Sequence, residues 1–224
     1  MELMLKEETL NFIETLKLNN SREWFTENKS WYERSRADFE KLVGQIIQGI
    51  NTFDPEIGYL ESKKCIFRIY RDVRFSQDKS PYKTHFGAVF SPQGLAKTSG
   101  YYFHLDPAEP FISCGHYMLM PDQLKKMRRG IYNDFETLES IINEKNFKKE
   151  FGDLYRDEDV LQRVPNGFDK NHPAAEYMKL KHFNVLKFLP REKLLDKDLA
   201  EYVIEMYKLM HPLSVFLNDI LLED

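Results

Sequence analysis

The 224-residue chain contains little cysteine and no long apolar run. Its two cysteines, Cys65 and Cys114, lie far apart, so the sequence holds neither a disulfide framework nor a CxxC metal motif. No stretch approaches the ~18 apolar residues of a transmembrane helix. The first residues lack the basic start and apolar centre of a signal peptide. We therefore expect a cytoplasmic protein with reduced thiols and no membrane partner.

An excess of charge of one sign is also missing. The formal net charge is −4, with 32 Lys and Arg against 36 Asp and Glu, whereas dedicated nucleic-acid binders usually carry a basic excess. The common signatures GxGxxG, GxxxxGK[ST], HExxH and GxSxG are absent as well, which argues against the enzyme classes that depend on them. The sequence predicts no cofactor and leaves open whether the protein is an enzyme.

Aromatic side chains, by contrast, are abundant. The chain has 17 Phe and 12 Tyr, and 42% of its residues are hydrophobic, which is typical of a folded protein with a sizeable core. Neither an internal repeat nor a Pro/Gly/Ser-rich linker interrupts it. We therefore expect one domain over residues 1–224.

Helical periodicity occurs at both ends of the chain. Apolar residues recur three and four positions apart, as on one face of a helix. Asn20 followed by Glu23 resembles a capping box at the start of the second helix. Pro212 is expected to kink or end the last one. The expected helices cover residues 5–18, 21–50, 121–131, 135–142, 172–181 and 199–210.

The middle of the chain changes to a period of two, which is typical of strands. Short connectors, such as the one at 92–99, indicate antiparallel pairing. We therefore predict an α+β fold in which an antiparallel four-stranded β-meander packs against helices from the N- and C-terminal parts. The expected strands are residues 66–75, 84–91, 100–106 and 111–118.

The segment from residue 66 to residue 91 carries the densest charge in these strands. Side chains alternate between the two faces of a strand, which separates a polar face (Arg68, Tyr70, Asp72, Arg74) from an apolar one (Phe67, Ile69, Val73, Phe75). Arg71 falls among the apolar residues. An unpaired buried charge is costly, so we expect Arg71 to find a carboxylate or to reach the sheet edge.

The polar face is the candidate site. Arg, Lys, Tyr and His together suit an anionic group such as a phosphate or carboxylate, and His85 or His104 could transfer a proton. A solvated face of ion pairs is the alternative interpretation. The candidate ligand-binding residues are Arg68, Tyr70, Asp72, Arg74, Lys79, Tyr82, Lys83, His85, Tyr102 and His104.

Two other clusters carry less information. Cys114 and His116 lie two residues apart with His104 nearby, but such scattered ligands predict a core cysteine rather than a metal site. The basic run at 125–129 is interpreted as a solvated helix face.

The chain also resembles a known family, the one designated domain of unknown function 2461, whose members are conserved hypothetical proteins. The resemblance rests on segments spread over most of the chain, and it implies one shared fold but no activity, substrate or cofactor. The segments are NNSREWFTENKSWYE (19–33), FRIYRDVRFSQDKSPYKTHFGA (67–88), GYYFHLDPAE (100–109), the helix 121–131 and GFDKNHPAAEYMKLKHF (167–183).

Three functions remain open at this point. The first is binding, with or without enzymatic processing, of a small anionic ligand on the polar sheet face. The second is a protein-interaction or scaffold domain whose hairpin charges are ion pairs. The third is nucleic-acid binding through the basic loop 79–85, against which the net charge of −4 argues. Nothing in the sequence indicates an oligomeric state.

Overall fold

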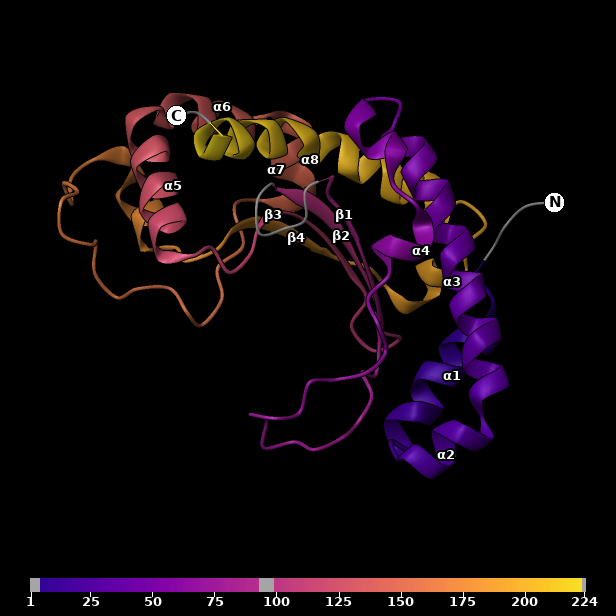
Figure 1. Cartoon of the computed structure of the whole chain (residues 1–224). Coiled ribbons are helices and arrows are strands. Elements are labelled where there is room, and N and C mark those ends of the chain that lie inside the picture. The colour runs from indigo at the N-terminus through magenta and orange to yellow at the C-terminus, as the bar shows by residue number, and fades with distance from the viewer. Residues whose placement is uncertain (1–4, 93–98, 223–224) are drawn as a thin grey trace. The chain divides into compact units, whose positions relative to one another are not determined.

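The computed structural model describes residues 5–92 and 99–222, which divide into two compact units (Figure 1). The connector expected at 92–99 lies, from residue 93 to residue 98, outside the described part. The prediction of one domain stays a prediction, and each unit has buried apolar residues of its own. The first unit falls within residues 1–90, 102–112 and 188–205, and the second within 91–101, 113–187 and 206–224.

Helices of the N-terminal part form much of the first unit. Figure 1 shows α1, α2 and α3 side by side, and α3 also contacts strand β1. Phe12 of α1 is fully buried and lies against the rings of Trp24 and Trp31. The helical elements here are α1 (Glu7–Leu18), α2 (Arg22–Glu27), α3 (Lys29–Ile50), η1 (Pro55–Tyr59), α4 (Ser62–Cys65), η3 (Arg191–Leu195) and the start of α8 (Leu199–Leu222).

The single helix expected over 21–50 is two helices. Asn28 both ends α2 and precedes α3, with φ −103° and ψ 16°. Its side-chain amide donates to the carbonyl of Trp24 at 2.9 Å. Asparagine competes in this way for backbone groups that a continuous helix would use, which explains the break.

Asn20 is not the cap of the second helix, because the hydroxyl of Ser21 accepts from the backbone N–H of Trp24 instead. Asn20 reaches across the unit to a residue 62 positions away. Its amide donates to the carbonyl of Tyr82 at 2.9 Å and accepts from the N–H of Tyr82 at 3.1 Å. The side chain thereby pairs with the backbone as a neighbouring strand would, and we call this pair the Asn20 clamp.

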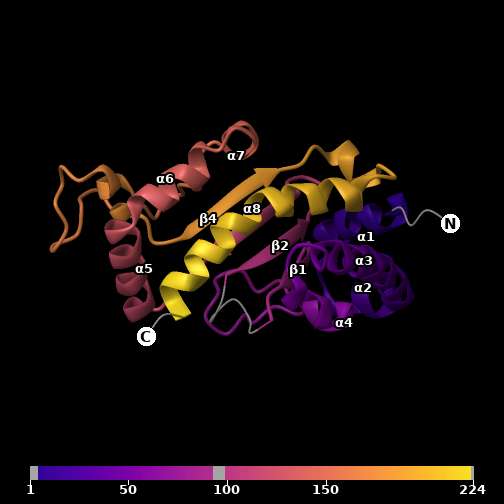
Figure 2. The ribbon, with the colours of Figure 1, turned by 90° about the horizontal axis from the view of Figure 1, so that it is seen from above.

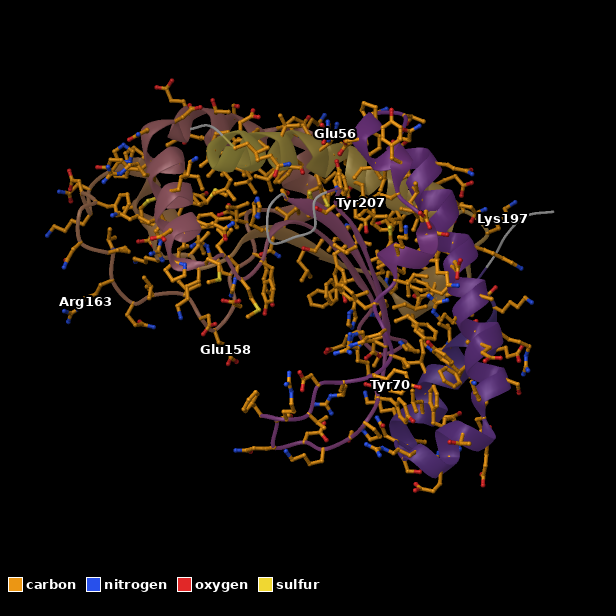
Figure 3. The ribbon with its side chains drawn as sticks, viewed as in Figure 1. Glu56, Tyr70, Glu158, Arg163, Lys197 and Tyr207 are labelled. Atoms are coloured by element: carbon orange, nitrogen blue, oxygen red, sulfur yellow. The ribbon has the colours of Figure 1, made fainter. Side chains whose placement is uncertain are left out.

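Four strands form one antiparallel sheet in the order β1–β2–β3–β4, which confirms the predicted α+β class. In the first unit α3 contacts β1, and in the second the ring of Tyr207 from α8 lies 5.0 Å from that of Tyr101 in β2 (Figure 3). The strands are β1 (Phe86–Phe90), β2 (Gly100–Leu105), β3 (Phe111–His116) and β4 (Phe183–Phe188).

The strand expected at 66–75 is wrong, and β4 takes the fourth place in the sheet. Residues 66–71 do approach β1 and the residues before it, but only through two isolated antiparallel bridges. Ile66 and Tyr70 are four residues apart, whereas their partners Ala88 and Tyr82 are six apart. Two extra residues on one side make a bulge that interrupts the regular ladder. The bulged stretch contains His85.

The second unit contains α5 (Pro121–Asn133), α6 (Phe135–Asn143), α7 (Lys145–Phe151) and η2 (Pro173–Lys179). The C-terminal half of α8 lies beside α5 in this unit, with Ile220 close to Gly130 (Figure 2). Helix α7 falls in a stretch too charged to predict one, and its N-terminus is capped by Glu144. The helix expected at 172–181 is a 3-10 helix.

Pro212 does not end α8, because the helix continues beyond it to Leu222. A proline inside a helix leaves the carbonyl four residues earlier without its partner. That residue, Lys208, is exposed, and so is Pro212, so water can replace the lost bond. The opposite face buries Met210, Leu213 and Leu217, which offsets the cost. Among the residues the structure describes, no helix combines the length and apolarity needed to cross a membrane.

Replacing Asn20 with Asp should destabilise the protein by about 1–3 kcal/mol. The carboxylate still accepts from the N–H of Tyr82 but repels its carbonyl, which loses a donor. Chemical denaturation measures the loss. Asn11→Asp, an exposed residue in α1, introduces the same charge and is the matched control. Equal stability of the two variants would show that the clamp contributes nothing.

Candidate functional site

Strand alternation assembles a group of polar residues on one face of the sheet in the first unit. Phe86 and Phe103 are buried on the helix-covered face, where both lie against Phe39. Their neighbours must therefore point the other way. His85, Tyr102 and His104 do so and are half-buried.

The two imidazoles form the centre of this group. The rings of His85 and His104 lie 4.2 Å apart between centroids, and the other side of His104 stacks on Phe111 at 4.5 Å. The Tyr102 hydroxyl and His104 Nδ1 share a hydrogen bond of 2.9 Å. When the hydroxyl donates, the proton of the neutral imidazole sits on Nε2. We call His85, Tyr102 and His104 the imidazole site.

Burial keeps this site uncharged at neutral pH. It lowers the pKa of His104 to about 4, with a further contribution from His85, while the carboxylate of Asp106 opposes the shift. The pKa of His85 is lowered by burial and by the charge of Lys83. Burial also raises the pKa of Tyr102 to about 12. Removing charged groups from water is the dominant cause in all three cases.

Cations lie beside the imidazole site. The ammonium of Lys83 sits 5.0 Å from the centre of the Phe67 ring, a cation–π contact. The pKa of Lys83 is lowered by burial and then by the positive charge of Arg68. Within residues 5–92 and 99–222, no carboxylate forms an ion pair with Lys83 or Arg68.

Two candidate tyrosines belong to a different environment. Tyr82 is buried and stacks on Phe25 of α2 with centroids 4.0 Å apart. Tyr70 lies 6.2 Å from the same ring, where the segment leaves the sheet (Figure 3). Both rings fasten this segment to α2 and are not part of the imidazole site.

The remaining candidates are held within the loop itself. Two guanidinium nitrogens of Arg74 donate to the carboxylate of Asp72, at 2.9 and 2.7 Å. The ammonium of Lys79 donates to the carbonyl of Val73 at 2.9 Å. Arg71 pairs with the carboxylate of Asp78, which confirms that it finds an acidic partner.

The expected apolar face is confirmed at Ile69, which is buried, but is wrong at Phe75, whose side chain is 95% exposed. Past the bridge at Tyr70, no strand among the described residues pairs with this segment to continue the alternation.

Three residues near the imidazole site escaped sequence reasoning. Phe111 is the first residue of β3, and its ring stacks on that of His104. Asp106 is the carboxylate whose charge raises the pKa of both imidazoles. Gly87 leaves space for the Tyr102 side chain, because a Cβ at residue 87 would lie only 2.6 Å from the Tyr102 hydroxyl. The glycine inside a strand was the available signal, because such a position often marks a close approach.

Neither cysteine offers a reactive thiol. Cys65 and Cys114 are both buried, and burial raises the pKa of Cys65 to about 11. No group of three or more His, Cys, Asp or Glu side chains placed to hold a metal ion occurs in the part of the chain that the structure describes.

Comparison with known proteins gives one match. A family model described as "Conserved hypothetical protein (DUF2461)" matches residues 8–216. No curated protein and no solved structure matches the chain significantly.

Acidification should destabilise the protein through His104. The unfolded imidazole has a pKa of about 6.5, and the folded one about 4. Between these values the unfolded state binds more protons, so the contribution of His104 to stability is complete above pH ~6.5 and falls as the pH drops toward ~4.

Thermal unfolding of the wild type and His104→Gln over this pH range tests the prediction, because the variant should lose less stability. Asn11→Gln, at an exposed position of α1, introduces the same side chain without removing an imidazole and should keep the wild-type pH dependence. An imidazole NMR titration of His104 with an ordinary midpoint would contradict the prediction.

Proposed function

Because the chain belongs to the DUF2461 family of conserved hypothetical proteins, a designation that carries no activity, we propose a function from its residues. It binds a small metabolite bearing a phosphate or carboxylate group on the sheet face that carries His85, Tyr102 and His104. The two buried thiols, Cys65 and Cys114, support a reducing compartment such as the cytoplasm as its location.

One observation carries the proposal. Lys83 and Arg68 are close enough for one charge to lower the pKa of the other, and no described carboxylate forms an ion pair with either. Water screens the exposed Arg68, but Lys83 is half-buried, and a like charge beside a partly desolvated ammonium favours a counter-ion. A bound anion would relieve the repulsion and would gain charge-assisted hydrogen bonds. The charge of Arg68 also lowers the pKa of Asp72, but the carboxylate of Asp72 is ion-paired with Arg74.

The imidazoles would add a proton-dependent contribution. Neutral His104 offers an Nε2–H donor when Tyr102 donates to its Nδ1. An anion placed against His85 and His104 would favour their charged forms and raise both pKa values. A charged imidazole would then give its proton to the leaving alcohol oxygen of a bound phosphate or carboxylate ester while water attacks the phosphorus or carbonyl carbon, which is how binding would extend to catalysis.

Anion binding at this face should depend on Lys83. Inorganic phosphate, phosphoenolpyruvate and citrate are the probes, with glucose as the uncharged control, and isothermal calorimetry gives the affinities. Lys83→Met should weaken the tightest probe about tenfold, because it removes one charge-assisted contact. Lys29→Met, an exposed residue of α3, removes the same charge away from the site and should change the affinity little.

The pH dependence gives a second readout. Affinity should rise as the pH falls from about 8 to about 6, because the bound state takes up protons on the imidazoles. His104→Gln should flatten this profile. Probes that bind equally well to wild type and Lys83→Met, with no proton uptake, would contradict the proposal.

A protein-interaction role is the second candidate, and Phe75 favours it. This ring is almost fully exposed at a loop whose base is fixed by the clamp and by Arg71, and the guanidinium of Arg74 lies 5.9 Å from its centre. Exposed aromatic and arginine residues on a preorganised loop are typical of binding hot spots. Phe75→Ser would abolish partner capture under this function and leave anion affinity unchanged.

A further inference from the structure

A cleft in the second unit is lined by the N-terminal half of α5 and by a loop at residues 165–168. It encloses about 400 Å³, within the range of small-molecule sites. Lys125, Arg128 and Arg129 contribute its charged groups. None of its lining residues is acidic.

The three cations share one side of α5. They are spaced three and four residues apart, and residues at this spacing lie on the same face of a helix. In the described structure neither Lys125 nor Arg129 forms an ion pair with a carboxylate. Arg163 lies on the outer side of the neighbouring segment, away from α5 (Figure 3). The basic run is thus more than a solvated helix face, because three of its members line a concave surface.

Arg128 has a donor without a partner. One terminal nitrogen donates to the carbonyl of Leu180 at 2.8 Å, which fixes the guanidinium in place. Its Nε is buried and makes no hydrogen bond to any described residue. A buried N–H group without an acceptor destabilises the fold, and more so when the group is charged. Because the Nε is buried, an oxygen-bearing anion in the cleft would instead meet the other terminal nitrogen of the guanidinium, which the Leu180 carbonyl holds in place.

The other wall of the cleft is apolar. Pro165 and Phe168 of the loop line it, and Leu124 of α5 adds an apolar side chain next to the cations. The Phe168 ring is held at 5.2 Å from that of Tyr132, which in turn stacks on His172 at 3.9 Å. The loop turns at Gly167, whose φ of +92° suits glycine. A ligand bound here would meet cations on one side and a supported apolar surface on the other.

A second cleft in the same unit makes a useful contrast. It encloses about 680 Å³ beside α6 and the C-terminal half of α8. Asp134 and Asp219 line it together with Lys126 and Arg129, so its charges balance. The smaller cleft has no acidic lining residue, so of these two clefts it is the one that favours a negatively charged ligand.

We propose that the cleft lined by Lys125, Arg128, Arg129 and Phe168 binds a small phosphate ester with an apolar or aromatic portion, of which a nucleoside monophosphate is a simple representative. The phosphate lies among the cations, where arginine provides paired donors and lysine a point charge. The ring lies on the apolar wall. This site belongs to the second unit and does not depend on the imidazole site of the first.

Calorimetry with AMP, inorganic phosphate and adenosine tests the site. AMP should bind more tightly than either part alone, because only AMP occupies both walls. The double variant Lys125→Met with Arg129→Met should weaken AMP about tenfold or more, since two charge-assisted contacts are lost. Both residues are exposed, so melting temperature should change little.

The matched control is Lys145→Met with Lys208→Met, two exposed lysines of the same unit outside the cleft. It should bind AMP as the wild type does. Equal weakening in both double variants would show diffuse charge attraction and overturn the proposal. So would the absence of AMP binding, or tighter binding of a single-stranded oligonucleotide than of AMP.

Lys83→Met separates this inference from the proposed function. If it abolished AMP binding while the cleft variant did not, AMP would occupy the imidazole site and the cleft proposal would fail. AMP binding that survives Lys83→Met but not the cleft variant supports the cleft, whatever happens to the anions tested on the sheet face.

Discussion

Burial of Phe86 and Phe103 is the constraint on which the first unit depends. Both rings lie against Phe39, and Phe86 also stacks on Phe12 of α1. In a strand, fixing one side chain fixes the direction of its neighbours. The hydrophobic core of the first unit therefore determines which residues carry the imidazole site, and substitutions in that core would act on the site through strand register.

The polar groups on the opposite face are costly to keep. Half-buried imidazoles, a partly buried lysine and a tyrosine hydroxyl all lose hydration, and their pKa values shift accordingly. An apolar set of the same size would stabilise the sheet more. Such arrangements occur preferentially where a protein binds or reacts. The same reasoning applies in the second unit to Arg128, whose buried Nε lacks a partner among the described residues.

Local patterns predicted part of this structure. The predicted strand at 100–106 matches β2, in which the candidates Tyr102 and His104 alternate with the buried Phe103, and periodicity located α1, α5 and α6. The bulge before β1 was not predictable, because Tyr82 at one end of it pairs with Asn20, which is far away in sequence. Likewise, the basic run on α5 becomes a cleft only when residues 165–168 approach it. Contacts between distant segments leave no periodic signal in either segment.

The Asn20 clamp also determines how far the effect of a substitution would spread. It closes the segment at Tyr82, next to the bridge with Tyr70, so the residues between these two tyrosines form a separately anchored appendage. Changes in length or sequence beyond the clamp would be absorbed there, and the backbone that carries His85 would keep its position. A substitution in the appendage would therefore alter the surface that the loop offers to a partner and leave the imidazoles of the sheet in place.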